Sequence, residues 1–307
     1  MKTNHVGTLA AAAGALVAAG LLVLMLLVVV EARPAEAAFP GKNGKIAYSS
    51  WDGQDYEIYT INPGGGGKFK VTHNNTEDST PSYSPSAKKI AYRGFDGQDD
   101  EIYTINPGGG GTFNVTDNKT DDEWPSYSPN GKKIVYSGWD GHDREIYTIK
   151  IGGGSRVQLT DNGTGDYEPE YSPNGKKIVY SGYDGSDWEI YTINAKGGGA
   201  RFQVTHNNTG DYEPSYSPNG KKIAYKGQEG PNADLEIYTI NAEGGGKFNV
   251  TDNKTDDEWP SYSPNGKKIA YQGQEGPNAD FEIYTINAGG GGRFNVTDND
   301  TEDYEAS

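Results

Sequence analysis

This chain contains no cysteine and only two methionines and four histidines. Without cysteine, the fold cannot depend on disulfide bonds, and zinc sites built from thiolates are excluded. The histidines are scattered along the chain, which also argues against a transition-metal site. The sequence has no G-x-S-x-G segment and no Walker phosphate loop, so it indicates neither an α/β-type serine hydrolase nor a P-loop NTPase.

Basic residues are also in deficit. The chain carries 27 Lys and Arg against 43 Asp and Glu, for a net charge of −16. Such a charge repels phosphates, so we expect no nucleic-acid partner and no electrostatic docking on anionic membranes. It is compatible with cations and with basic partners.

Long uncharged runs are missing after the first residues. The one such run, Val6 to Val30, follows Lys2 and precedes Ala35-Glu36-Ala37, a typical signal-peptidase site. We therefore interpret residues 1–37 as a signal peptide, with a retained membrane anchor as the alternative, since the run is long enough to span a bilayer. Either interpretation predicts an extracytoplasmic location, whether periplasmic, cell-surface or secreted. Membrane contact is expected only if the segment is retained.

The rest of the chain is organised around one repeated stretch, which reads P-S-Y-S-P-N-G-K-K-I-A-Y from Pro214 to Tyr225. Asn-Gly between two strand-like arms predicts a hairpin with a type I′ turn. Related stretches begin at Pro81, Pro125, Pro169 and Pro260, so the spacings are 44, 44, 45 and 46 residues. With a shortened first copy at Asn43-Gly44, the alignment gives six units.

Each unit predicts four strands. In the unit that begins at Pro169, we expect strands at residues 170–172, 177–181, 188–193 and 201–205. No stretch within the repeats has helical periodicity, so a helical solenoid is not indicated. Four antiparallel strands in about 45 residues is typical of a propeller blade. We therefore predict an all-β fold, a single six-bladed β-propeller over residues 38–307.

Three repeated motifs resemble those of a known family. They read Y-S-P-N-G-K-K-I-A-Y, D-G-x-D-x-E-I-Y-T-I-N and G-G-G-x-x-F-x-V-T. They resemble the WD40-like repeat of the TolB β-propeller over about residues 39–307. Tyr replaces the usual Trp before Ser-Pro, and Asn replaces the usual Asp before the turn Gly. The N-terminal α/β domain of TolB is not found, so the Pal-binding and Tol-complex role of TolB does not carry over.

An aspartate lies three residues before each repeat proline, or before the alanine in its place. The six are Asp78, Asp122, Asp166, Asp211, Asp257 and Asp303. Because this connector enters the innermost strand, we predict a ring of carboxylates at one mouth of the channel. The ring could hold a hydrated divalent cation such as Ca²⁺ on two or three ligands, with Asp166 and Asp211 as candidates. The alternative is that each Asp accepts hydrogen bonds from backbone amides of its turn.

A second acidic pattern, D-G-x-D-x-E, recurs in units one to four. Its members are Asp52, Asp55 and Glu57; Asp96, Asp99 and Glu101; Asp140, Asp143 and Glu145; and Asp184, Asp187 and Glu189. The pattern lacks the spacing of an EF-hand loop, so we interpret it as a polar hairpin between the second and third strands. Units five and six carry longer loops there, Gln228 to Asp234 and Gln274 to Asp280.

The functional hypothesis is an exported, non-catalytic protein that binds a protein, peptide or glycan at the channel mouth and loop rim. One alternative is a propeller-type lyase or hydrolase acting on polysaccharide or peptide with channel carboxylates as acid and base. Another is a structural or self-associating cell-surface protein. We further predict that the chain from about Asp303 runs into the first blade beside its innermost strand and closes the ring.

Overall fold

The computed structural model describes residues 44–228, 233–276 and 279–307, all of which belong to one compact unit. The predicted signal peptide or anchor at residues 1–37 lies outside the described residues. Among those residues, no helix is long and apolar enough to cross a membrane.

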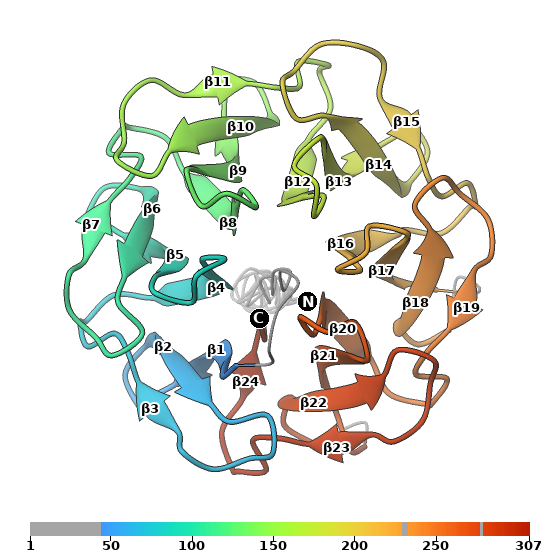
Figure 1. Ribbon diagram of the computed structural model, residues 1–307. Helices are drawn as coiled ribbons and strands as arrows, with labels where there is room; N and C mark the ends of the chain where they lie inside the picture. Colours follow the sequence, from blue (N-terminus) through green and yellow to red (C-terminus); the bar gives the residue numbers. More distant parts are fainter. Residues whose placement is uncertain (1–43, 229–232, 277–278) are drawn as a thin grey trace, which may run out of the picture. The chain divides into compact units, whose positions relative to one another are not determined.

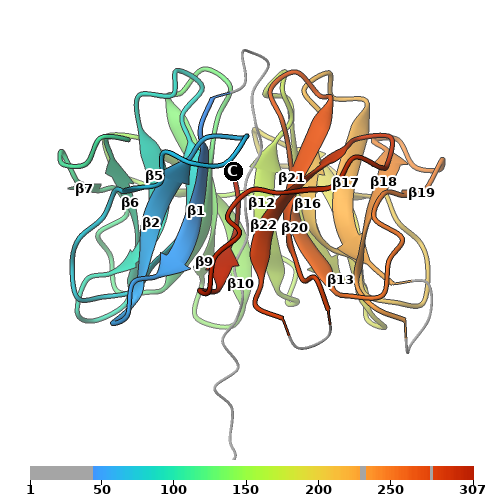
Figure 2. The same ribbon diagram turned by 90° about the horizontal axis from the view of Figure 1, so that it is seen from below.

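The described unit is a six-bladed propeller, as the repeat predicts. It contains six sheets of four antiparallel strands each, arranged around a common axis (Figure 1). The strands of each blade run between two opposite faces of the unit (Figure 2). Blades are numbered here from the one that contains β1, so blade 1 is β24-β1-β2-β3 and blade 2 is β4-β5-β6-β7.

The strands fall into four sets by their distance from the axis. The innermost are β24 (Asp303–Tyr304), β4 (Asp78–Tyr83), β8 (Asp122–Tyr127), β12 (Asp166–Tyr171), β16 (Tyr212–Tyr216) and β20 (Asp257–Tyr262). The second are β1 (Ile46–Trp51), β5 (Ile90–Phe95), β9 (Lys133–Trp139), β13 (Lys177–Tyr183), β17 (Lys222–Gly227) and β21 (Lys268–Gly273). The third are β2 (Tyr56–Ile61), β6 (Asp100–Ile105), β10 (Arg144–Lys150), β14 (Trp188–Asn194), β18 (Glu236–Asn241) and β22 (Glu282–Asn287). The outermost are β3 (Phe69–Lys70), β7 (Phe113–Asn114), β11 (Val157–Gln158), β15 (Phe202–Gln203), β19 (Phe248–Asn249) and β23 (Phe294–Asn295).

The predicted hairpin between the first two strands is present, but its turn is not of type I′. In blade 4, Gly175 has φ 66° and donates its N–H to the Ser172 carbonyl at 2.7 Å. Pro173 and Asn174 therefore occupy the two central positions of a type I turn, where the fixed φ of proline is favourable. The left-handed residue follows the turn, and in blade 2 Ala87 takes this place with φ 53°.

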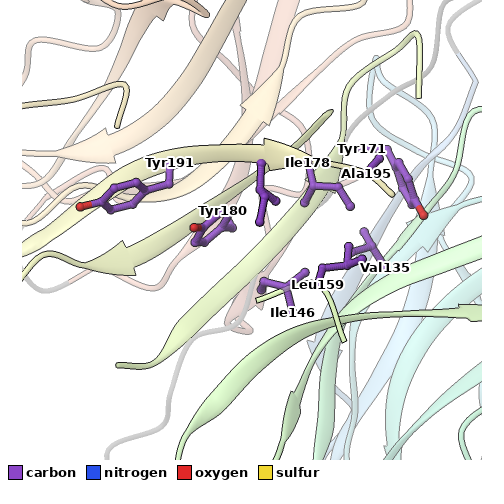
Figure 3. Packing of buried hydrophobic residues seen from close by; sticks show 9 residues of the cluster. Val135, Ile146, Leu159, Tyr171, Ile178, Tyr180, Tyr191 and Ala195 are labelled. Carbon is purple, nitrogen blue, oxygen red and sulfur yellow. The ribbon is translucent and has the colours of Figure 1, made fainter. Parts of the chain in front are cut away.

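The core lies between blades, because the second and third strands are apolar on both faces. One cluster joins Val135, Ile146 and Leu159 of blade 3 to Ile178 and Tyr180 of blade 4 (Figure 3). Ile178 and Tyr180 are fully buried. Burying an isoleucine side chain contributes about 1.5–3 kcal/mol, so each blade is stabilised by its two neighbours.

The two ends of the described chain meet in blade 1, as predicted. Strand β24 pairs with β1 through Ser49–Tyr304 and Ser50–Asp303. Beyond it, Ser307 and Ala47 exchange backbone hydrogen bonds of 2.8 and 2.9 Å. Strand β24 is itself the innermost strand of this blade, the position that β4, β8, β12, β16 and β20 occupy in the other blades. The pairing closes the ring without a covalent link.

Candidate functional site on the loop face

The two faces of the propeller differ in charge. The hairpin face carries the turns between the first and second strands, with exposed lysines such as Lys132 and Lys176. The loop face carries the D-G-x-D-x-E loops and the connectors between blades, with exposed acids such as Asp52, Asp96 and Asp121. Because the repeat places lysine after every hairpin turn and acids at the other strand ends, the opposite charges separate onto the two faces.

The six predicted ring aspartates lie at the loop-face end of the innermost strands, but they are buried. Asp122, Asp166, Asp211, Asp257 and Asp303 are fully buried, and Asp78 is 2% exposed. Each accepts a hydrogen bond from an asparagine side chain four residues earlier, at 2.6 Å for Asn162 to Asp166 and for Asn207 to Asp211. The structure therefore does not bring these carboxylates to an open channel mouth.

The alternative interpretation, in which each aspartate accepts hydrogen bonds from backbone amides of its turn, correctly made the aspartate an acceptor but named the wrong donor. The donor to the aspartate is the asparagine side chain. The backbone N–H of the same asparagine donates to a glutamate of the third strand, as from Asn162 to Glu145 at 2.8 Å. This chain of bonds fastens each connector to its blade. Binding of Ca²⁺ by Asp166 and Asp211 stays a prediction.

Burial changes the protonation of these carboxyl groups. It raises the pKa of Asp166, Asp211 and Asp257 to about 7. It raises the pKa of Asp78 and Asp122 to about 8, and the nearby Glu57 and Glu101 carboxylates add to the effect. Since the same cause acts in every blade, the ring offers no pair of carboxyl groups with pKa values pushed far apart.

A second feature of the innermost strands was not expected from the sequence. The residue two positions after each ring aspartate forms a bulge with positive φ, a rare conformation for non-glycine residues. These residues are Thr80, Trp124, Glu168, Glu213, Trp259 and Glu305, with φ of 54° to 60°. Where the residue is glutamate, its carboxylate reaches the next blade and accepts the N–H of the equivalent residue there.

Three such contacts connect neighbouring blades. Glu305 Oε2 accepts from Thr80 N at 2.6 Å, Glu168 Oε2 from Glu213 N at 2.7 Å, and Glu213 Oε2 from Trp259 N at 2.7 Å. The glutamates near the ring thus serve as links between blades. Their burial raises the pKa of Glu168, and that of Glu213 well above its ordinary range.

Two basic side chains complete this inner layer. Arg93, 2% exposed, bonds Glu77 at 2.6 Å and Asp100 at 3.0 Å, and reaches Glu123 of the next blade at 3.4 Å. Lys226 forms ion pairs with Glu213 and, at 3.6 Å, with Glu258 of the next blade. Sequence reasoning missed both residues. The available signal was a charged residue directly after the Tyr of the second strand, where three other blades have serine.

Aromatic residues gather on the loop face. Trp51, Phe95 and Trp139 end the second strands of blades 1, 2 and 3, and their side chains are 42%, 42% and 40% exposed. Each is followed by an exposed aspartate, namely Asp52, Asp96 and Asp140. These three aromatic–aspartate pairs, which we call the rim pairs, place a flat apolar ring beside a carboxylate in three successive blades.

The buried ring of Trp124 and three half-buried rings continue the aromatic cluster between blades 3, 4 and 5. Trp124 contacts Tyr167 with centroids 5.4 Å apart, and Tyr167 contacts Trp188 at 5.2 Å. Trp188 then lies 6.0 Å from Tyr212, and the Lys226 ammonium lies 5.2 Å from the Tyr212 ring centre. The loop face can therefore offer both π-faces and carboxylates to a ligand.

The hairpin face has a hollow of its own between blades 3 and 4, with a volume of about 820 Å³. It is lined by Lys132, Lys133, Lys150 and Lys196, together with glycines and asparagines of the turns. This lining is positive and lacks the exposed aromatic–acid combination of the loop face, so we take the loop face as the candidate site.

The comparisons with known proteins agree with the fold. The TolB beta propeller domain family matches residues 35–307 of the chain. No curated protein sequence matches it.

Solved structures extend the likeness to the three-dimensional level. TolB from Acinetobacter baumannii is 24% identical with a TM-score of 0.76, and the match covers 87% of this chain and 67% of that one. A putative TolB from Agrobacterium tumefaciens is 18% identical with a TM-score of 0.69, over 86% and 98% of the two chains. A nidogen/laminin complex matches at 12% identity and a TM-score of 0.67, over 85% and 97%. At these identities the likeness concerns the fold alone.

Proposed function

The chain belongs to the TolB β-propeller family, and from this premise we propose that it is an exported, non-catalytic binding protein. Its ligand is a positively charged segment of a protein or peptide, held on the loop face. The observation that carries this proposal is the set of rim pairs, in which Trp51, Phe95 and Trp139 are each exposed and each followed by an aspartate.

The chemistry of the rim pairs suits lysine and arginine side chains. A cation over an aromatic ring gains about 0.5–1 kcal/mol at an exposed site, and a neighbouring carboxylate adds an ion pair where it has no basic partner within the chain, unlike Asp52, which pairs with Lys70. Aromatic residues are also enriched among the side chains that dominate protein–protein binding energies. The net charge of −16 attracts basic ligands over a longer range, which raises their rate of association.

Two further points support binding over catalysis. Acid–base catalysis by two carboxyl groups needs environments that push their pKa values apart. Here burial moves the pKa of the ring aspartates in the same direction in every blade. The name of one structural neighbour, a nidogen/laminin complex, also describes an assembly of two proteins.

The test compares two triple variants that remove equally exposed aromatic rings. The first, Trp51→Ala/Phe95→Ala/Trp139→Ala, removes the rim pairs. The second, Phe69→Ala/Phe113→Ala/Phe248→Ala, removes rings of the outermost strands that are 42%, 46% and 44% exposed. Binding of a fluorescent lysine- and arginine-rich peptide is measured by anisotropy, with an acidic peptide of equal length and a neutral oligosaccharide as further ligands.

We expect the rim variant to bind the basic peptide about tenfold or more weakly, since loss of about 1.4 kcal/mol has that effect. The outer-strand variant should bind like the parent, and added salt should weaken binding in both. Equal losses in the two variants, or preferential binding of the oligosaccharide or the acidic peptide, would show that the proposal is wrong.

A further inference from the structure

The loop between β5 and β6 in blade 2 brings three carboxyl groups together. Oxygen atoms of Asp96, Asp99 and Glu101 all lie within 4.8 Å of one another. The loop is held by local bonds, since Asp96 Oδ1 accepts the N–H groups of Gln98 at 2.7 Å and Asp99 at 3.3 Å. The sequence pattern was interpreted as a polar hairpin, but the fold gathers its acids into a cluster that is exposed at Asp96 and buried at the other two residues.

An independent observation points to a ligand at this cluster. Asp99 is 8% exposed, and neither of its carboxylate oxygens has a hydrogen-bond partner. A buried carboxylate without a partner is costly, so such groups are normally paired or bound to a metal. The charges of Asp96 and Asp121, which are also negative, act on Asp99. Burial, with the Asp96 charge next, raises the pKa of Asp99.

Blade 1 shows what the same cluster does with a cation inside it. Its members are Asp52, Asp55 and Glu57, and the Lys70 ammonium lies 2.5 Å from Asp52 Oδ2 and 3.0 Å from Glu57 Oε1. In blade 2 the residue equivalent to Lys70 is Asn114, which has no charge. The structure describes all three acids of the blade 2 cluster, and none of them forms an ion pair with another described residue.

We propose that Asp96, Asp99 and Glu101 bind a Ca²⁺ ion, which takes the place that the Lys70 ammonium has in blade 1. The donor set consists of hard oxygen atoms, which Ca²⁺ prefers. Ligands on opposite sides of Ca²⁺ are roughly 4.6–5.2 Å apart, given Ca–O distances of about 2.3–2.6 Å, and the observed span is within 4.8 Å. Asp96 is exposed, so water molecules can complete the six to eight ligands.

Blades 3 and 4 carry related clusters, made of Asp140, Glu145 and Asp161, and of Asp184, Asp187 and Glu189. In each, the buried glutamate has one oxygen, Oε2, without a hydrogen-bond partner. Both oxygens of Asp99 lack partners, as do those of the equivalent Asp55 in blade 1. Blade 2 differs from blade 1 because no described basic side chain pairs with the other two acids of its cluster, as Lys70 does with Asp52 and Glu57. The experiment is therefore designed on blades 1 and 2.

The test counts Ca²⁺ ions bound per chain by equilibrium dialysis and metal analysis, on the folded protein. Asp99→Asn should lose one ion relative to the parent, and Lys70→Asn should gain one, because it removes the ammonium from the blade 1 cluster. Asp280→Asn removes an exposed carboxylate elsewhere on the same face and should leave the count unchanged. Circular dichroism checks that each variant is folded, and Asp96→Asn replaces Asp99→Asn if the latter fails.

A melting experiment gives a second readout. Ca²⁺ that binds the native state raises the melting temperature by mass action, and the rise should be smaller in Asp99→Asn than in Asp280→Asn. An unchanged ion count in folded Asp99→Asn or Asp96→Asn would overturn the proposal. The proposal would also be overturned if Lys70→Asn bound no more Ca²⁺ than the parent, because the Lys70 ammonium would then not be occupying a Ca²⁺ site in blade 1.

Discussion

Blades 1 and 2 are neighbours built on one pattern, yet they differ at three equivalent places. The innermost strand of blade 1 comes from the far end of the chain, whereas that of blade 2 is continuous with its second strand. Ser50 faces Asp303 in blade 1, and Gly94 faces Asp78 in blade 2. Lys70 enters the carboxylate cluster of blade 1, and Asn114 stands in that position in blade 2.

Two of these differences concern the same problem, a carboxylate removed from water. In blade 1 a side-chain hydrogen bond from Ser50 and the charge of Lys68 partly offset the burial that raises the pKa of Asp303. In blade 2 the carboxylate of Asp78 occupies the space beside Gly94, so a Cβ atom on residue 94 would collide with it. The comparison teaches that the repeat fixes where the carboxylates lie, while single substitutions decide how each is compensated.

The largest effect should come from breaking the closure of blade 1. Deletion of residues 303–307 removes the β24–β1 pairing, the Ala47–Ser307 bonds and the buried Ala306. We expect a loss of at least about 3 kcal/mol, from several hydrogen bonds at about 0.5–1.5 kcal/mol each and the burial of apolar surface. In thermal denaturation this corresponds to a fall of roughly 6–12 °C.

The control for this deletion is Asp300→Ala, which changes an exposed residue shortly before β24 and should melt within about 2 °C of the parent. If the deletion melted at the parent's temperature, the pairing of β24 would contribute nothing and the ring would be stable without closure.

A smaller effect should follow when the residue that pairs with the ring aspartate is replaced by alanine, Ser50 in blade 1 and Gly94 in blade 2. A Cβ on residue 94 would lie 2.8 Å from Asp78 Oδ1 and 3.2 Å from the Tyr92 and Tyr103 rings. Gly94→Ala should therefore cost about 1–3 kcal/mol, as overpacking does. Ser50→Ala keeps an existing Cβ and loses one hydroxyl, so about 1 kcal/mol is expected. Urea denaturation measures both, and a greater cost for Ser50→Ala would reverse the comparison.

The last effect concerns pH. Burial raises the pKa of Asp78 to about 8 in the folded protein, against about 3.9 in an unfolded chain. Between these values Asp78 binds a proton in the folded state but not in the unfolded state, so its contribution to stability is fully present at low pH and is lost as the pH rises from about 4 to about 8. Asp78→Asn cannot titrate and should show a shallower fall across this window. The other five ring aspartates still titrate, so part of the slope remains in this variant.

Melting temperatures of the parent and of Asp78→Asn, recorded from pH 5 to pH 8.5, measure this difference. Asp280→Asn is the control, since its carboxylate is exposed. Equal slopes for the parent and Asp78→Asn would mean that the Asp78 carboxylate is already charged in the folded protein at pH 5.

Much of the fold could be predicted because its signals are local. Proline marks each hairpin and glycine all but that of blade 2, and Ile and Tyr on both faces of the second and third strands require packing on two sides. The closure by Asp303 was predictable for the same reason, since the final residues repeat the entry to an innermost strand. The turn type was predicted wrongly because Pro173 favours the type I geometry over the positive φ that Asn174 tolerates.

The sequence by itself determined the number of blades, their strands and the places where acids recur, because these depend on spacing along the chain. Only the tertiary structure decided the surroundings of those acids. Asp166 is buried and bonded to Asn162, Glu168 reaches Glu213 of the next blade, and Lys70 enters the carboxylate cluster of blade 1 but has no counterpart in blade 2. The physical reason is that exposure and charge compensation depend on which side chains of other strands and blades come within reach, and such contacts leave no periodic signal in the chain.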